Sequence, residues 1–168
     1  MRETGGDVLY LDFDGVLHHE NCLWHPRRGA FLVAPPGYTL FQHVTLLEAL
    51  LAPYPSVEIV LSTSWVRRYG CSHTAKRLPP SLRQRVIGAT FHSRMNERDF
   101  MELQRGQQVM GDVSRRQPKR WLALDEDPDG WPEGCPQNFV RTDEHAGISA
   151  LHVQEELIDK LSLFEGAT

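Results

Sequence analysis

The sequence predicts an α/β fold in which a central parallel β-sheet is covered by helices on both faces. Two observations support this prediction. Short apolar runs of strand length alternate along the chain with segments of helical periodicity. Three of the apolar runs end at residues with reactive or hydrogen-bonding side chains, Asp12, Ser62 and Asp125. Parallel strands gather ligands at their carboxyl ends, so we expect residues 1–168 to form a single domain with one site at that edge.

The first half of the chain predicts two buried strands with a flap and a helix between them. Residues 7–12 form an apolar run that ends in a carboxylate and is followed by a further acid and a glycine, which indicates a strand running into a turn. Residues 18–38 are rich in proline and mixed in polarity, so we expect a loop with a small hairpin or flap. Apolar residues at helical spacing predict a helix at 39–52 that stops before Pro53. An apolar run at 57–61 predicts the second strand.

The second half of the chain repeats the alternation after a broken region of short helical pieces. In order, we expect a strand at 86–91, a helix at 105–116, a strand at 121–125 that ends in acids, a short strand at 138–142 and a helix at 149–164. Ser149 is the residue type preferred at a helix N-cap, so we expect it to cap the last helix.

Composition narrows the classes of partner and compartment. A net charge of −4 and a pI of about 6.0 give no global field for binding nucleic acid. Three arginine pairs (27–28, 67–68 and 115–116) either gather around an anionic substrate or are solvated surface charges. Cys22, Cys71 and Cys135 lack disulfide or zinc spacing, which favours a reducing compartment. No apolar stretch has the length of a signal peptide or a membrane helix, so we expect a cytoplasmic protein with no membrane contact and no obligatory protein partner.

The residues after the first predicted strand carry the strongest chemical signal. Asp12 and Asp14 are separated by one residue, and two carboxylates held this close favour a bound cation. Oxygen ligands select Mg²⁺, and Gly15 allows the sharp turn that brings backbone N–H groups to the same point. Asp12 is placed to act as a covalent nucleophile and Asp14 as the acid and base that moves the proton. The simpler alternative is a turn that merely follows a strand.

The other parts of a known pattern follow in order. The chain resembles the haloacid dehalogenase-like (HAD) superfamily, whose first motif is a hydrophobic strand followed by Asp-X-Asp-Gly, as in residues 8–17. This resemblance implies a Rossmann-like three-layer α/β/α sandwich, a Mg²⁺ cofactor and a phosphatase that works through an aspartyl-phosphate. The second motif of the superfamily is a Ser or Thr after the next strand. Ser62 fits it and Thr63 is the neighbouring candidate for contact with the phosphoryl group.

The third and fourth motifs are a basic residue and a strand that ends in acids. Arg105 best matches the basic residue, usually a Lys, and Arg98 and Lys119 remain alternatives. Asp125 matches the fourth motif and is expected to bind Mg²⁺ together with Asp12 and Asp14. Next to it, Glu126 is a candidate for positioning the metal or the substrate, with Asp127 as an alternative. Gly15 and Thr63 are candidates for binding the substrate.

The spacing of the motifs bears on the substrate. The 50 positions from Asp12 to Ser62 are used by the flap and one helix, and residues 65–104 are short and broken, so neither common insertion point holds a full cap domain. Capless members of the superfamily leave the site open to bulky or macromolecular esters. Ser62-Thr-Ser-Trp65 followed by two arginines resembles HAD domains associated with RNA repair, which implies a nucleotide or nucleic-acid end as substrate, alongside a phosphorylated small molecule.

Three further interpretations of the sequence remain. A non-catalytic phosphate- or metal-binding regulatory protein on the same fold is the principal alternative to an enzyme. Histidines 18, 19 and 25 lie in the expected flap, where we expect solvated side chains rather than metal ligands. The tryptophans at 24, 65, 121 and 131 are expected to pack rather than to stack on bases.

Overall fold

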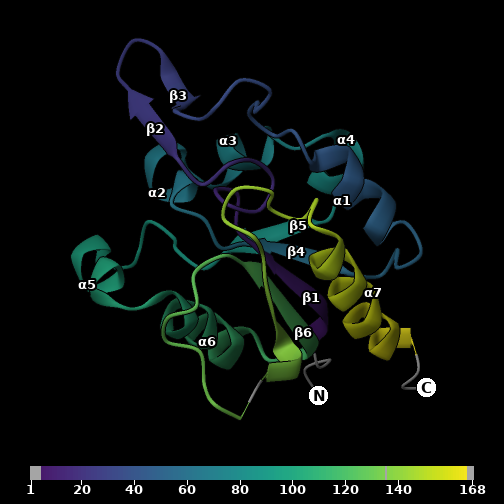
Figure 1. The fold of residues 1–168 in the computed structure, drawn as a ribbon. Helices are drawn as coiled ribbons and strands as arrows, with labels where there is room; N and C mark the ends of the chain where they lie inside the picture. Colours follow the sequence, from purple (N-terminus) through teal and green to yellow (C-terminus); the bar gives the residue numbers. More distant parts are fainter. Residues whose placement is uncertain (1–4, 135, 166–168) are drawn as a thin grey trace.

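The computed structural model describes residues 5–134 and 136–165, which form an α/β fold around a five-stranded sheet (Figure 1). The described pairings in this sheet are all parallel, so the strands end at one common edge. In spatial order the strands are β5 (Val86–Ala89), β4 (Glu58–Leu61), β1 (Gly5–Leu11), β6 (Pro118–Asp125) and β7 (Phe139–Arg141). The predicted α/β fold with a central parallel sheet is therefore confirmed, and β1 lies at its centre.

Helices cover both faces of the sheet. Along β1, Leu9 and Leu11 pack in the larger core cluster with α1 (Val44–Leu51) and α7 (Leu151–Glu165). Val8 and Tyr10 point to the opposite face, toward α6 (Arg105–Arg116). Figure 1 shows the sheet between α6 on one side and α7 on the other. The Tyr10 hydroxyl donates to Asp112 of α6 at 2.8 Å, which ties this helix to the central strand.

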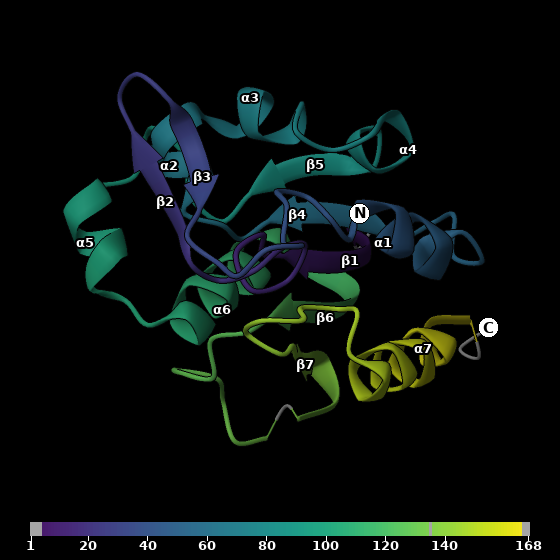
Figure 2. The same cartoon turned by 45° about the horizontal axis from the view of Figure 1, so that its top comes forward.

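The segment between β1 and α1 contains the predicted small hairpin, which we call the flap. Its strands are β2 (Cys22–His25) and β3 (Gly29–Leu32), which pair antiparallel. Figure 2 shows the flap next to α2 (Trp65–Tyr69). The interval between β4 and α6 holds β5 and short helices: α2, α3 (Cys71–Ala75), α4 (Pro80–Arg83) and α5 (Glu97–Glu102). Within the described residues, neither interval contains a separate cap domain.

Helix α1 begins at Val44 rather than at residue 39 as predicted. The reason is Phe41, whose φ of 55° lies in the left-handed region and cannot continue a helix. Its backbone N–H donates to Nδ1 of His18 at 3.1 Å, and its ring packs edge-on against Phe13 and Trp65. A non-glycine residue in this region costs about 1–3 kcal/mol, so these contacts must hold it there.

Other helix and strand boundaries differ from the predicted ones by a few residues, because they depend on contacts that the apolar pattern does not reveal. Strand β6 begins at Pro118 instead of 121, because it pairs with β1 along polar residues as well, including an Arg120–Asp7 ion pair at 2.7 Å. The prediction that Ser149 caps the last helix is wrong. Helix α7 begins at Leu151, and the Ser149 hydroxyl donates to the Ala146 carbonyl instead.

The structure bears on two expectations from composition, the state of the cysteines and the absence of a membrane helix. Cys22 and Cys71 are free thiols, while Cys135 lies outside the described residues. In the part of the chain that the structure describes, no helix has the length and apolar character required to cross a membrane.

Candidate active site

The register of the sheet aligns three residues at the carboxyl ends of its central strands. Leu11 pairs with Leu61 of β4 and with Leu124 of β6, so the next residue of each strand, Asp12, Ser62 and Asp125, falls in one row. The row is fixed by the backbone: Asp12 N–H donates to the Leu124 carbonyl at 3.2 Å, and Ser62 N–H donates to the Leu11 carbonyl at 2.8 Å. All three side chains in the row are buried. The structure therefore brings together the residues that the sequence predicted at the strand ends.

Arg105, the first residue of α6, contacts this row along its whole width. Its Nε lies 3.3 Å from Asp125 Oδ2 and its Nη2 lies 3.8 Å from Asp12 Oδ2. Its Nη1 donates to the Ser62 carbonyl at 2.7 Å. The two alternative basic residues lie elsewhere, since Arg98 is exposed on α5 and Lys119 is exposed near the start of β6.

Gly106 explains why α6 can place Arg105 so close to Asp125. A Cβ at Gly106 would collide with the backbone of Gly130 and Trp131, so only glycine lets α6 approach the loop that follows β6. The Gly106 N–H also donates to the Asp129 carbonyl at 2.9 Å. The helix N-terminus and the acidic loop are thus joined directly through their backbones.

Burial perturbs the charges in this row. Burial raises the pKa of Asp12; Arg105 counteracts this, and the negative charge of Asp14 adds to it. Burial and the neighbouring Asp12 hold the pKa of Asp125 well above its usual range. Burial disfavours the charge on Arg105, but the carboxylates of Asp12 and Asp125 outweigh this and raise its pKa. One arginine against two buried acids leaves an excess of negative charge that a cation would relieve.

Asp125 supplies the observation that tests whether the row fits a metal ion. Its Oδ1 accepts the Asp127 N–H at 3.0 Å. Its Oδ2 is buried and has no hydrogen-bond partner among the described residues, although Arg105 Nε is near. A buried carboxylate oxygen without a partner is costly. Together with the Asp12 carboxylate it forms an oxygen donor set of the kind that Mg²⁺ prefers, so the residues present fit this ion.

The Asp14 side chain has a different environment from the row. Its Oδ1 accepts two hydrogen bonds, from His18 Nε2 at 2.8 Å and from Trp65 Nε1 at 2.9 Å. His18 Nδ1 accepts the Phe41 N–H, so the ring proton of a neutral His18 sits on Nε2. With Oδ1 already accepting two donors, a proton on the Asp14 carboxyl group belongs on Oδ2.

His18 and Trp65 are the two residues of the site that the sequence did not single out for it. The expectation of solvated side chains is wrong for His18, which is fully buried, and for His19, which is also buried. The thiol of Cys22 lies within 4.8 Å of the Asp14 and His18 ligand atoms. Burial raises the pKa of Cys22 to about 12, and His18 Nε2 carries its proton. These facts favour a hydrogen-bonded cluster over a second metal site.

Gly15, Glu126 and Thr63 have structural contacts of their own. Gly15 has a φ of 75°, and a Cβ there would collide with the Glu126 side chain, so the glycine lets Glu126 lie over the turn. Burial, with the charge of Asp12, raises the pKa of Glu126 to about 7. Thr63 Oγ1 accepts the Trp65 N–H at 3.4 Å, and Thr63 lines a pocket with Arg105. Contact of these three residues with a substrate stays a prediction.

A central parallel sheet with acids after β1 and β6 and a basic residue between them defines a haloacid dehalogenase-like domain. More narrowly, residues 8–153 match the family model described as the HAD domain in Swiss Army Knife RNA repair proteins, and the chain belongs to this family. Domains of the HAD family are typically hydrolases. No curated protein and no solved structure matches the chain.

Proposed function

We propose that this protein is a Mg²⁺-dependent phosphohydrolase that cleaves a phosphate monoester through an aspartyl-phosphate. The observation that supports it best is the pair of buried acids, Asp12 and Asp125, on adjacent strands with Arg105 beside both and one Asp125 oxygen that accepts no hydrogen bond from the described residues. Asp12, Asp14 and Asp125 would hold Mg²⁺. When bound, the ion would supply positive charge against the phosphate oxygens and make them less repulsive to an attacking carboxylate.

The chain's own residues divide the reaction into two displacements. The Asp12 carboxylate attacks phosphorus, the ester P–O bond breaks with its electron pair on the leaving oxygen, and Asp14 gives that oxygen a proton. A water then attacks the aspartyl-phosphate, Asp14 takes back a proton, and inorganic phosphate leaves with Asp12 restored. Arg105 and the Ser62 hydroxyl hold the phosphoryl oxygens, with Thr63 as the alternative hydroxyl.

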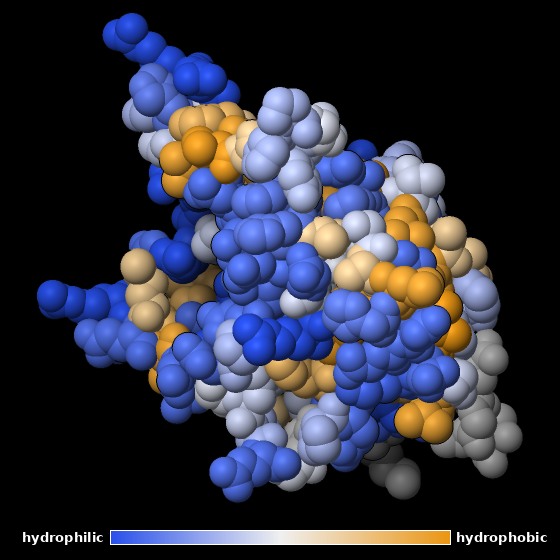
Figure 3. All heavy atoms as spheres, viewed as in Figure 1, coloured by the Kyte–Doolittle hydropathy of each residue, from blue (hydrophilic) through white to orange (hydrophobic). Residues whose placement is uncertain are grey.

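The family and the accessibility of the site support a nucleic-acid end or a nucleotide as the substrate class. The family occurs in RNA repair proteins, which points to a nucleotide or a nucleic-acid end rather than another phosphorylated small molecule. The flap projects from the body without a cap domain behind it among the described residues. Figure 3 shows the surface hollowed between the flap and α5, which leaves access for the end of a polymer.

Phosphate release tests this proposal. We would measure it with Mg²⁺ and with EDTA, from mononucleotides and from oligonucleotides with 3′- or 5′-phosphates. We expect Mg²⁺-dependent release by the wild type and no detectable release by Asp12→Asn, because the amide cannot attack phosphorus. Circular dichroism should show an unchanged fold. The matched control is Asp159→Asn, which makes the same exchange at an exposed position on α7 and should leave activity intact.

The contrary outcomes are distinct. Activity near the wild-type level in Asp12→Asn would remove this residue from the mechanism. Absence of release from every substrate, combined with Mg²⁺ or phosphate binding by calorimetry, would favour the non-catalytic binding protein instead.

A further inference from the structure

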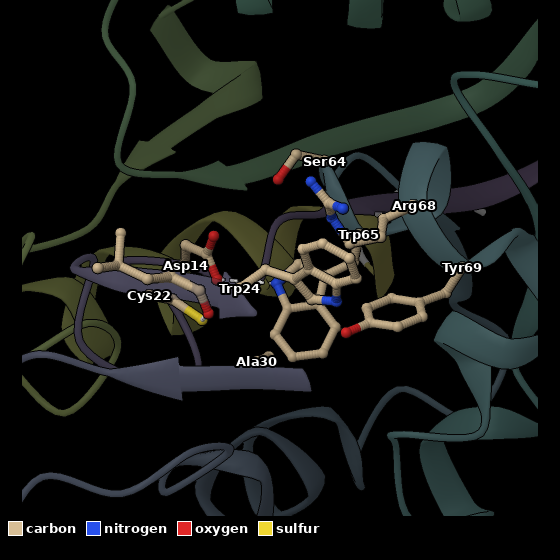
Figure 4. A pocket seen from close by; sticks show the side chains of 9 residues that line it. Asp14, Cys22, Trp24, Ala30, Ser64, Trp65, Arg68 and Tyr69 are labelled. Carbon is tan, nitrogen blue, oxygen red and sulfur yellow. Dashed lines mark hydrogen bonds between the residues drawn. The ribbon is translucent and has the colours of Figure 1, made fainter. Parts of the chain in front are cut away.

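A pocket of 260 Å³ lies between the flap and α2, beside Asp14. Figure 4 shows Asp14 at one end of it and the rings of Trp24, Trp65 and Tyr69 around the remainder. Pockets that enclose a drug-sized ligand usually measure about 300–1,000 Å³. A space below that range, with aromatic walls, suits one planar ring system rather than a whole nucleotide.

The aromatic walls come from two elements and differ in solvent exposure. Trp65 is buried, and its Nε1–H is fixed on Asp14. Trp24 belongs to β2 of the flap and is 40% exposed, so part of its ring surface is open to a ligand. The Arg68 guanidinium of α2 lies 3.8 Å from the Trp24 ring centroid, which holds the ring over the pocket by a cation–π contact.

Tyr69 provides a polar group for the same space. Its ring is tilted against Trp65, with centroids 5.6 Å apart, and it lines the pocket. Its hydroxyl is buried and has no hydrogen-bond partner among the residues that the structure describes. Buried hydroxyl groups are normally paired, so a ligand with hydrogen-bonding edges would complete this one.

We propose that this pocket binds the nucleobase of the nucleotide that carries the scissile phosphate. This inference rests on the proposed function, in which Asp14 gives a proton to the leaving oxygen. Because Asp14 lines the pocket, the pocket lies on the side of the leaving alcohol, which in a nucleotide is the nucleoside. The base stacks on Trp24, and a small shift of the Tyr69 ring would bring its buried hydroxyl to the polar edge of the base.

The form of the pocket also defines the state of the nucleic acid. A base can enter an aromatic slot only when it is free of its neighbours in a stack and of a pairing partner. Stacking on aromatic rings tolerates every base because each has a π-face. The substrate is therefore a mononucleotide or an unpaired end of any sequence.

The test compares two esters that share ribose and phosphate and differ only in the base. Binding of adenosine 5′-monophosphate and of ribose 5-phosphate would be measured by calorimetry in the Asp12→Asn protein, and kcat/KM in the wild type. Base–aromatic stacking of ~1–3 kcal/mol corresponds to a preference of roughly 5- to 150-fold for the nucleotide. Adenosine 3′-monophosphate, measured in parallel, shows which end of the nucleoside faces Asp12.

Two variants and a control separate the pocket from general damage. Trp24→Ala should bring the preference close to one. Tyr69→Phe, which keeps the ring and the fold, should lower it a few-fold. Val33→Ala changes an exposed flap residue that does not line the pocket, and it should keep the wild-type preference.

Each result decides between the two proposals. Equal affinity of the Asp12→Asn protein for both esters, or a preference unchanged in Trp24→Ala and Tyr69→Phe, overturns the base pocket even when phosphate is released. A nucleotide preference that depends on Trp24, without phosphate release, sustains the base pocket and removes the hydrolase.

Discussion

Asp14 is the residue whose surroundings say most about the proposed chemistry. His18 and Trp65 both donate to its Oδ1, so the carboxyl group cannot rotate without losing two hydrogen bonds. A hydrogen bond to a charged group contributes about 1.5–3 kcal/mol. The cluster therefore fixes the orientation of Oδ2, the atom that passes a proton to the leaving oxygen in the mechanism we propose.

Trp65→Phe tests this fixed orientation, because it removes one donor and keeps an aromatic ring in the core. We expect kcat to fall about tenfold on glycerol phosphate, whose alkoxide must receive a proton. On p-nitrophenyl phosphate, which leaves as a stable phenolate, kcat should change much less. Equal losses on both esters would show that Trp65 matters only for packing.

His43 carries a second prediction, on stability against pH. Burial, assisted by the neighbouring His18, lowers the pKa of His43 below its usual 6.5. Below pH 6.5, His43 therefore binds a proton more readily in the unfolded chain than in the folded protein. The free energy of unfolding falls as the pH falls. Above pH 6.5 this contribution is fully present.

His43→Leu should flatten that dependence. Urea unfolding of the wild type at pH 7 and pH 5.5 should show a drop in midpoint that is smaller in the variant. His73→Leu, at an exposed position on α3, should retain the wild-type drop. An equal drop in all three proteins would rule out His43 as the source.

At the scale of elements, the contact between α6 and the loop after β6 sets the position of Arg105. Gly106→Ala should lower the free energy of unfolding by about 1–3 kcal/mol, the usual cost of overpacking, and should reduce activity by moving Arg105 off Ser62. Gly111→Ala on the same helix meets only the flexible Arg115 side chain. It should be neutral or stabilising, since alanine favours a helix. Chemical unfolding of both variants checks this.

The order of elements was predictable because each apolar run is a local signal. Helix α6 at residues 105–116 has the predicted bounds. The delayed start of α1 was not predictable. It depends on Phe41, whose conformation is held by His18 and Trp65, 23 and 24 positions away. Contacts between distant residues leave no trace in local periodicity.

In the candidate site, too, the features that depend on local sequence were predictable and those that depend on distant contacts were not. Parallel strands place the residues after them together, so Asp12, Ser62 and Asp125 could be grouped from sequence. The ion pairs of Arg105 with Asp12 and Asp125 could not be derived, because they depend on how closely α6 approaches the sheet at Gly106. The burial of His18 was missed because a histidine in a proline-rich segment carries no sign of its solvent exposure.

For the molecule as a whole, Mg²⁺ should couple the site to global stability. An ion that binds only the folded protein at ten times its Kd adds about 1.4 kcal/mol, which raises the midpoint of thermal unfolding by roughly 3–6 °C in a domain of this size. Asp125→Asn should lose most of this shift, and Asp159→Asn should keep it. If residues 1–168 form a single domain as predicted, the transition should remain one step. A midpoint of thermal unfolding that does not change with Mg²⁺ would argue against binding of this ion.

The central position of β1 constrains how the protein is made. On the ribosome, β1 emerges well before either neighbour, and its pairing with β6 needs residue 124. At ~5–20 residues per second, translation from Leu11 to Leu124 takes roughly 6–23 s. During that time one edge of the strand has no partner, and Asp12 lacks the backbone that fixes it. A ribosome-bound fragment ending before β6 should therefore be a client for chaperones, and the backbone of Asp12 gains its hydrogen bond to Leu124 only after β6 has emerged.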